Sequence, residues 1–175
     1  EKTALADAEV EYQDHKSDTI YACFPVKSSD IKEIVGNDIV IWTTTPWTIP
    51  ANRALAYNES LTYVLIEISD EGEFKNKKII IAEELLNSVI QDCEIKNYKK
   101  IKNFKGQKFK NTICSHPFLD LGYKYDIPML EAHFVTTEQG TGIVHCAPSH
   151  GPDDFNLCLN NGIKAIETVD GDGKY

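Results

Sequence analysis

The sequence predicts an α+β domain with a mostly antiparallel, β-barrel-like core and a few peripheral helices. Short apolar runs rich in valine, isoleucine and threonine recur along the chain, and glycine, proline or asparagine turns separate them, as is typical of strands. Only two stretches have helical spacing, and they do not alternate with strands as they would in a parallel α/β fold. The 175 residues suffice for a sizeable core, so we expect a single domain over residues 1–175.

Apolar periodicity predicts the elements in chain order. A weak alternation marks residues 9–12, and strands are expected at residues 19–26, 38–45, 54–57, 62–68, 78–82, 99–109, 127–135, 143–146 and 165–169. The turn at residues 69–72 should join its two neighbouring strands into a hairpin. Helices are expected at residues 83–92, and at residues 152–160 before the Asn161-Gly162 stop. The first helix carries an apolar stripe for the core, at Leu85, Leu86, Val89 and Ile90.

Composition and charge narrow the function classes. The net charge of −9 disfavours non-specific nucleic-acid binding by the whole surface, and no apolar run is long enough to cross a membrane. The five cysteines form no CxxC pair, which indicates reduced thiols in a cytoplasmic protein and argues against a zinc knuckle. The chain begins at Glu1 without a methionine or a signal-peptide pattern, so we expect a piece of a longer protein.

One basic strip stands out in this acidic chain. Residues 96–110 contain seven lysines and no acidic residue. Two interpretations are open: a solvated edge strand whose lysines prevent aggregation, or a strip that contacts nucleic-acid phosphates.

A threonine-rich segment is the first candidate site. Residues 42–53 hold both tryptophans, four threonines and two prolines, directly after the apolar residues 39–41. Pro46 and Pro50 lack a backbone donor and restrict the residue before them, so irregular backbone should follow the strand. Hydroxyls and freed backbone amides therefore gather at a strand end, where they could hold a small polar ligand or a water. The alternative is a hydroxyl-rich strand end with Trp42 and Trp47 packed in the core.

The second candidate segment is residues 140–155, a glycine turn followed by a short strand, a loop and a helix start. Pro152 suits the first helical position, which places Asp153 and Asp154 in the first turn, where the helix dipole favours an ionised carboxylate. Histidines and these acids could ligate a metal, but their spacing matches no usual zinc pattern, so no metal site is predicted. Ser149 beside His150 lacks the G-x-S-x-G elbow of a hydrolase nucleophile.

Together these two segments resemble the inserted editing domain of isoleucyl-tRNA synthetases. That family carries a segment of the form TTTPWT-x-P-A-N followed by H-x-A-P-x-H-G-x-x-D, and both occur here in that order, at residues 43–52 and 145–154. The valyl and leucyl relatives have a TTRP-type segment, so Pro46, Trp47 and Asn52 argue against them. Ser149 stands where the family has glycine. The resemblance covers the whole chain, although only these two motifs are specific.

The resemblance implies a β-barrel core, no cofactor in this domain, and hydrolysis of an ester without a protein nucleophile. Its threonines would position a water and the terminal adenosine, Asp154 would bind the free α-ammonium, and His145 would line the side-chain pocket. The implied catalytic residues are Thr43, Thr44, Thr45 and Asp154. The implied substrate-binding residues are Trp42, Thr48, Asn52 and His145, with Trp42 against the adenine or, equally, in the core. His15, His116 and His133 are expected to be surface or structural histidines.

The function implied is hydrolytic proofreading of tRNA(Ile) mischarged with valine, with valyl-adenylate as a further candidate substrate. The implied partners are the 3′ end of that tRNA and the remaining domains of a parent isoleucine–tRNA ligase, and the isolated domain should be a monomer. No HIGH-type or KMSKS-type segment is present, so ATP binding and amino-acid activation would belong to the parent enzyme. Two alternatives remain: a catalytically silent module that binds the tRNA acceptor end, and a purely structural insertion.

Overall fold

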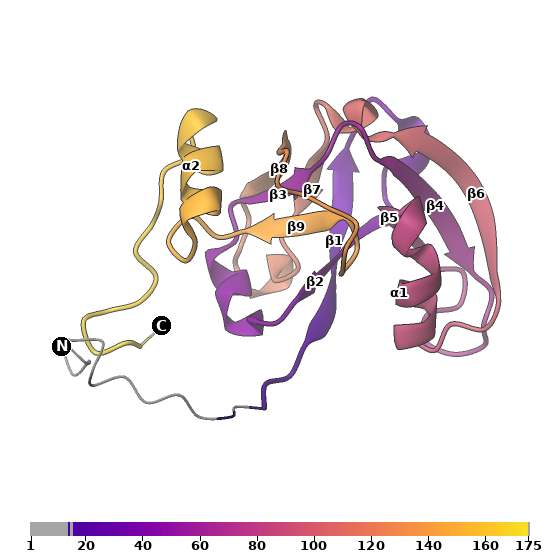
Figure 1. The fold of residues 1–175 in the computed structure, drawn as a ribbon, viewed down its shortest axis with the longest axis horizontal. Helices are drawn as coiled ribbons and strands as arrows, with labels where there is room; N and C mark the ends of the chain where they lie inside the picture. Colours follow the sequence, from indigo (N-terminus) through magenta and orange to yellow (C-terminus); the bar gives the residue numbers. More distant parts are fainter. Residues whose placement is uncertain (1–13, 15, 175) are drawn as a thin grey trace.

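The computed structural model describes residue 14 and residues 16–174. These residues build one nine-stranded mixed sheet with few helices (Figure 1). The strands are β1 (Ile20–Ser28), β2 (Asp38–Thr43), β3 (Ala54–Tyr57), β4 (Thr62–Ile68), β5 (Lys78–Ala82), β6 (Tyr98–Lys105), β7 (Ile113–Ser115), β8 (Asp126–Glu131) and β9 (Ile143–Cys146). The helices are α1 (Leu86–Asp92) and α2 (Pro152–Asn160). Short 3-10 turns are η2 (Lys32–Ile34), η3 (Pro46–Ala51), η4 (Glu83–Leu85), η5 (Gly106–Phe109) and η6 (Leu119–Leu121).

The hydrogen-bonded strand order is β6-β4-β5-β2-β1-β7-β8-β3-β9. Within the described residues only the pairs β2–β5 and β3–β8 are parallel, and all other neighbours are antiparallel. The α+β class and the mostly antiparallel pairing are therefore confirmed. The strand order has two ends, β6 and β9, so the sheet does not close and the barrel-like part of the prediction is not confirmed.

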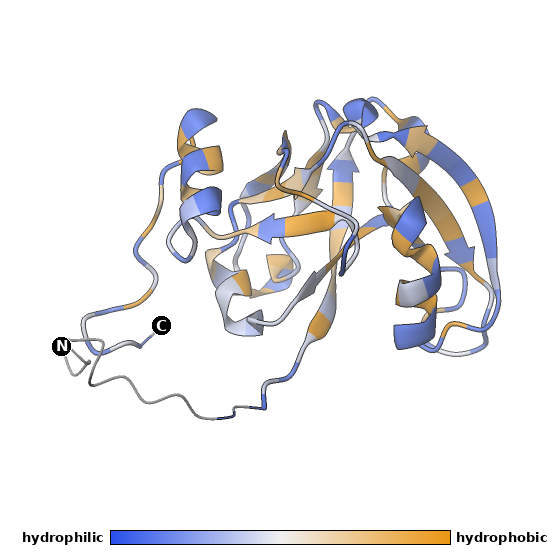
Figure 2. Cartoon of the chain, in the orientation of Figure 1, coloured by the Kyte–Doolittle hydropathy of each residue, from blue (hydrophilic) through white to orange (hydrophobic). Residues whose placement is uncertain are grey.

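The hydrophobic core lies along the middle of the sheet. β4 and β5 are buried over most of their length, whereas β6 buries only Phe104 fully. Figure 2 shows the same contrast, with β4 largely hydrophobic and β6 largely hydrophilic. Phe104 and Phe109 pack against the ring of Tyr63, with Phe109 at 4.8 Å between centroids. These aromatic contacts hold the basic edge of the sheet onto the core.

Five predicted elements have the predicted bounds, namely residues 54–57, 62–68, 78–82, 143–146 and 152–160, and the hairpin of β4 and β5 is confirmed. The strand predicted at 99–109 with a turn at Gly106 is confirmed up to that turn, where a Cβ on Gly106 would lie 2.1 Å from the backbone oxygen of Asn58. The residues after the turn form the 3-10 turn η5 and not a strand. Residues 165–169 form no strand, since no neighbouring strand pairs with them.

Other predictions have different bounds in the structure. The strand predicted at 19–26 is β1, which ends two residues later, and the strand predicted at 38–45 is β2, which ends at Thr43. Residues 83–85 form a 3-10 turn, so α1 begins only at Leu86. The strand predicted at 127–135 ends at Glu131, because its partner β3 ends at Tyr57, which is paired with Glu131. The short strand β7, which ends at Ser115, was not predicted. The weak alternation at residues 9–12 lies outside the described residues.

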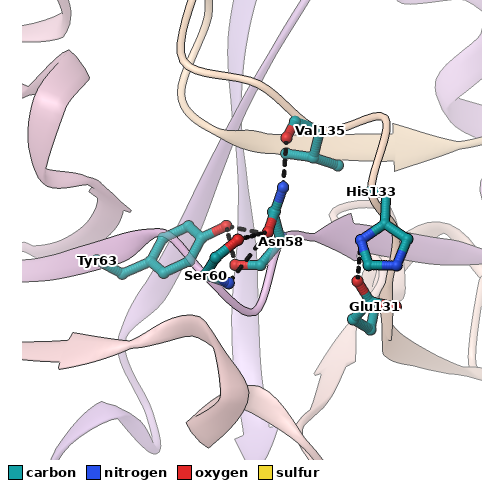
Figure 3. Close-up of polar contacts among 6 residues, drawn as sticks. All are labelled: Asn58, Ser60, Tyr63, Glu131, His133 and Val135. Carbon is teal, nitrogen blue, oxygen red and sulfur yellow. Dashed lines mark hydrogen bonds and ion pairs between the residues drawn. The ribbon is translucent and has the colours of Figure 1, made fainter.

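The connection between β8 and β9 is fastened at both ends, and Figure 3 shows the anchor at Val135. Near its start, Asn58 Nδ2 donates a hydrogen bond to the carbonyl oxygen of Val135 over 3.0 Å. At its end, the Tyr63 hydroxyl donates to the carbonyl oxygen of Gly142 over 2.9 Å and accepts from the backbone N–H of Asn58. Ser60 in turn holds Asn58 Oδ1 through its own backbone N–H and hydroxyl. The loop between these anchors is therefore held in place beside β9.

Candidate active site

A cleft of about 490 Å³ opens where β2 ends, between η3, β9 and the start of α2. It brings the two motif segments together, although they lie about a hundred residues apart in the chain. Seven of the eight residues proposed from the sequence line it, namely Trp42, Thr43, Thr44, Thr45, Thr48, His145 and Asp154. Asn52 is the exception.

The threonine segment takes its shape from short-range hydrogen bonds at the end of β2. Thr43 is buried, and its Oγ1 accepts from the backbone N–H of Thr45 over 3.1 Å. Pro46 then begins η3, in the position that needs no N–H donor. Thr48 donates its hydroxyl to the carbonyl oxygen of Thr45 over 2.8 Å. This turn leaves Thr44 and Thr45 exposed at the cleft, as the prolines in the sequence predicted.

His145 is held by a hydrogen-bonded chain whose direction can be worked out. Asn52 Nδ2 donates to the carbonyl oxygen of Ala54 over 2.9 Å, which fixes the amide orientation. The same nitrogen lies 3.1 Å from His145 Nδ1, so Nδ1 accepts. The proton must then be on Nε2, which donates to Thr48 Oγ1 over 2.9 Å. The Thr48 hydroxyl donates its hydrogen to the carbonyl oxygen of Thr45, so every hydrogen bond in the chain has one donor and one acceptor.

This network settles what His145 can do. The side chain is buried, and burial, followed by the nearby His116 and His150, lowers its pKa to about 4. The imidazole is therefore neutral at pH 7, and both ring nitrogens are already hydrogen-bonded within the protein. A general base needs a free nitrogen within reach of the proton it takes. In this arrangement His145 lines the cleft with both ring nitrogens engaged within the protein.

Asn52 contributes to the cleft only through His145. Its side chain is fully buried and does not line the cleft, in contrast to the direct pocket position that the family resemblance implies. Its Oδ1 is buried and has no hydrogen-bond partner among the described residues. A polar atom left unpaired in the interior costs stability. The amide therefore serves to orient the imidazole.

Asp154 lies in the first turn of α2, as predicted, and is half-buried at the cleft. Its Oδ2 accepts a hydrogen bond from the backbone N–H of Ala147 over 2.8 Å. Burial nevertheless raises the pKa of Asp154, opposed by that hydrogen bond, so desolvation works against the ionised state expected from the helix dipole. No lysine or arginine of the described residues forms an ion pair with it. A cationic ligand would supply the missing charge.

The loop before α2 accommodates the serine that replaces the family glycine. Ser149 does not have a positive φ, so no glycine is required there. Its hydroxyl donates to the carbonyl oxygen of Ile166, and His150 Nε2 lies 2.9 Å from Thr168 Oγ1. Ser149 therefore holds the segment after α2 and is not paired with His150 as a nucleophile.

The other histidines agree with their structural assignment. His116 is buried and donates from Nε2 to the carbonyl oxygen of Ile49 over 2.9 Å, and this hydrogen bond holds η3 in place. Its Nδ1 accepts from the backbone N–H of Phe118, and its ring stacks on Tyr123 at 4.6 Å. His133 lies on the surface beside Glu131 (Figure 3). His15 lies outside the described residues.

The described part of the chain contains neither a cluster of possible metal ligands nor a membrane-spanning helix. No group of three or more possible metal ligands occurs among residues 14 and 16–174. None of the helices in those same residues is long and apolar enough to cross a membrane.

One wall of the cleft was not predicted. The β8–β9 connection contributes Phe134, Thr136 and Gln139, followed by the glycine turn. Gly142 has a φ of 71°, and a Cβ there would lie 2.4 Å from Ala82 Cβ, so only glycine permits this close packing. The two glycines around Thr141 were a sequence signal for this loop. No motif marked Phe134 or Gln139, because they reach the cleft only through the tertiary fold.

Solved structures with this fold are synthetase editing domains. The P. knowlesi cytosolic leucyl-tRNA synthetase editing domain superposes with a TM-score of 0.57 at 13% identity, covering 87% of this chain and 66% of that one. The crystal structure of GlLeuRS-CP1 matches with a TM-score of 0.56 at 22% identity, over 72% of this chain and 47% of that one. The molecule thus has the fold of the editing domains of aminoacyl-tRNA synthetases.

Sequence comparison shows which synthetases the chain is similar to. The chain is 80% identical over its full length to part of the isoleucine–tRNA ligase of Pelagibacter ubique, and 44% identical to that of Gluconobacter oxydans, and it spans 19% of each ligase. No protein-family model matches the chain. The resemblance inferred from the two motifs is confirmed: from end to end, the chain is similar to a segment of isoleucine–tRNA ligases.

Proposed function

We propose that this chain is the proofreading part of an isoleucine–tRNA ligase and hydrolyses the ester of valine mischarged onto tRNA(Ile). The observation that carries the proposal is the convergence of the threonine segment, the neutral His145 and the half-buried Asp154 in one cleft. Each supplies something that an aminoacyl ester requires: hydroxyls for the ester and a water, a rigid wall for the side chain, and a negative charge for the ammonium.

The need for a second site follows from the size of one methylene. A hydrophobic pocket distinguishes isoleucine from valine only about 10–200-fold, a limit for which isoleucyl-tRNA synthetase is itself a standard example. A second site that admits only the smaller product removes the error.

Asp154 would hold the substrate by its free α-ammonium. It is the only carboxylate among the described residues that line the cleft. An ammonium beside it would offset the desolvation that raises its pKa, and the charge-assisted hydrogen bond would fix the position of the ester. The same interaction explains why a half-buried carboxylate would be placed here without a protein cation.

Hydrolysis itself would use a water. The water adds to the ester carbonyl, the acyl–oxygen bond breaks, and a proton passes to the departing ribose hydroxyl. Thr44 and Thr45, exposed at the cleft, would orient the water and the ester, which are already reactive enough to need no protein nucleophile. His145 and Thr48 would act by shape, because their polar atoms are already engaged with each other.

The remaining parts of the proposal concern the context of the chain. The site would need no cofactor, and the chain, a monomer when isolated, would act in the cytoplasm beside the other domains of the ligase. These domains would deliver the 3′ end of the tRNA to the cleft.

The test is a deacylation assay with Val-tRNA(Ile) and Ile-tRNA(Ile), each compared with buffer. The proposal expects hydrolysis of the valyl ester well above the buffer rate and little hydrolysis of the isoleucyl ester. Binding of the tRNA without hydrolysis would support a silent binding module. Neither binding nor hydrolysis, in this chain and in the ligase that carries it, would support a structural insertion.

A further inference from the structure

The Ile143 end of β9 is held from outside the cleft, by the hairpin of β4 and β5. On β4, the Tyr63 hydroxyl donates to the carbonyl oxygen of Gly142 over 2.9 Å. On β5, the backbone N–H of Ala82 donates to the carbonyl oxygen of Thr141 over 2.8 Å. Gly142 also packs closely on Ala82, with no room for a Cβ between them. Within the described residues β9 pairs with β3 alone, so the hairpin holds it from a second side.

Tyr63 is the side chain that makes this connection, and the core fixes its position. It is fully buried, and its ring packs against Phe104 and Phe109. Burial raises the pKa of Tyr63, so the hydroxyl keeps its proton and remains a donor at neutral pH. The hydroxyl accepts from the backbone N–H of Asn58 over 3.0 Å (Figure 3). Its proton is directed at Gly142, because the other acceptor, the Asn58 carbonyl oxygen, lies farther away, at 3.5 Å.

From these contacts we propose that Tyr63 is a positioning residue for the hydrolysis, an inference that rests on the proposed function. Tyr63 does not line the cleft, so it acts through Gly142. Gly142 does line the cleft, and it directly precedes β9, the strand that carries His145. A hydrogen bond at Gly142 therefore fixes where this part of the cleft wall lies relative to the threonine segment.

The position of the wall governs the rate of hydrolysis more than the affinity for the substrate. Asp154, which would bind the ammonium, is tied to Ala147, beyond the other end of β9. Its hydrogen bond does not involve Tyr63 or Gly142. Attack by water is far more sensitive to placement, since a displacement of about 1 Å can cost about 100-fold in rate. Loss of the Tyr63 hydroxyl should therefore slow the reaction and leave binding largely unchanged.

Single-turnover deacylation of Val-tRNA(Ile) by Tyr63→Phe tests this inference. Varying the protein concentration gives the maximal rate and the half-saturating concentration separately. We expect the maximal rate to fall about 10- to 100-fold and the half-saturating concentration to stay within about twofold. The substituted ring keeps its packing against Phe104 and Phe109, and each rate is divided by the folded fraction measured by circular dichroism. A loss of stability alone would not change the rate expressed in this way.

Two control variants assign the effect to the hydroxyl at Gly142. Tyr21→Phe also removes a tyrosine hydroxyl with one strong partner, Asp92 at 2.7 Å, but Tyr21 does not line the cleft. Its maximal rate should stay within about twofold of the wild type. Asn58→Asp keeps the oxygen that accepts from Ser60 and removes only the donor to Val135, the other anchor of the loop. Its maximal rate should fall by less than about threefold.

Amide hydrogen exchange tests the same contact without any hydrolysis. The carbonyl oxygen of Gly142 loses its side-chain partner in Tyr63→Phe, so the backbone amides of residues 142–146 should exchange faster than in the wild type. In Tyr21→Phe the same amides should exchange as in the wild type.

A maximal rate in Tyr63→Phe within about twofold of an active wild type would overturn the role of Tyr63 and leave the proposed function standing. A change in the half-saturating concentration alone, or an equal loss of rate in Tyr21→Phe or Asn58→Asp, would overturn that role as well. A wild type that fails to hydrolyse Val-tRNA(Ile) would overturn the proposed function. Exchange would then decide the contact by itself: faster exchange at residues 142–146 would support placement of the turn by Tyr63, and unchanged exchange would overturn it.

Discussion

Two regions stand out in the sequence, the cleft beside β9 and α2 and the lysines of β6. The elements α2 and β6 lie at opposite ends of the fold (Figure 1). Both regions contain many polar side chains, but the two regions differ in how these side chains are hydrogen-bonded and exposed. In the wall of the cleft, His145 is buried and hydrogen-bonds to Thr48 and to Asn52, which lies behind it. On β6, the lysines are exposed, and Lys100 and Lys102 each pair with one glutamate of another element.

The lysines of β6 have local partners. Lys100 lies 3.4 Å from Glu83, and Lys102 pairs with Glu33. β6 is also an end strand of the sheet, where unpaired backbone groups would otherwise invite another chain. The protected-edge interpretation therefore accounts for the strip by itself. The comparison indicates that polar groups hydrogen-bonded to one another are a better sign of a functional site than exposed charge.

The largest expected effect is on stability, from the buried histidine of the cleft. The pKa of His145 is about 4 in the folded chain against 6.5 for an ordinary histidine. Between these values the unfolded chain binds a proton that the folded chain does not, so falling pH favours unfolding. This difference in the pKa of His145 corresponds to about 3 kcal/mol in the free energy of unfolding, of which about 2 kcal/mol should be lost between pH 7 and pH 5.

Urea unfolding of the wild type and of His145→Gln at several pH values measures this contribution. His116, whose pKa burial also lowers, is present in both proteins and cancels in the difference. The free-energy curves should converge as the pH falls from 7 to 5. Parallel curves would mean that His145 is not held neutral by its surroundings.

The next effect concerns the carboxylate of the cleft. Asp154→Ala should slow single-turnover deacylation of Val-tRNA(Ile) at least tenfold, since losing a charge-assisted hydrogen bond costs about 1.5–3 kcal/mol. Asp153→Ala is the matched control: it removes the same charge from the same helical turn, but Asp153 is exposed and does not line the cleft. Similar rates for the two variants would remove Asp154 from its proposed role.

A smaller effect is expected on discrimination between amino acids. If His145 is the wall that excludes the larger side chain, His145→Ala should raise hydrolysis of Ile-tRNA(Ile) relative to Val-tRNA(Ile), within the roughly 1–3 kcal/mol that one methylene commands. The measurement is the ratio of the two rates in variant and wild type. Loss of both activities in proportion would show that the histidine supports the loop without gauging the substrate.

Local sequence explains why much of the fold was predictable. Strands such as residues 62–68 and 78–82 are short apolar runs bounded by their own turn residues, so their bounds and hairpin need no other information. Residues 165–169 show the limit, because similar apolar residues form no strand without a neighbour to pair with. The parallel pairing of β2 with β5 likewise depends on tertiary packing.

The site shows the same division. The motifs predicted seven lining residues because those side chains follow directly from a strand end or a helix start. Asn52 belongs to the same motif, yet only the structure reveals that it lies behind His145. Phe134 and Gln139 could not be found from sequence, since their place depends on hydrogen bonds from Asn58 and Tyr63, more than 70 residues away in the chain.

The smallest effect is expected at β6. Replacing Lys99, Lys100 and Lys102 together by glutamine should change the deacylation rate of Val-tRNA(Ile) by less than about twofold. It should lower the free energy of unfolding by less than about 1 kcal/mol, because exposed ion pairs contribute little.

Tight tRNA binding is not expected from a chain with a net charge of −9. The sharper test is the salt dependence of tRNA affinity, because each phosphate that a lysine neutralises adds about 0.7–0.9 to the slope of log affinity against log salt concentration. A slope reduced by about two or more in the triple variant would place β6 in the path of the tRNA. An unchanged slope would leave edge protection as the role of these lysines, with the cleft as the functional end of the sheet.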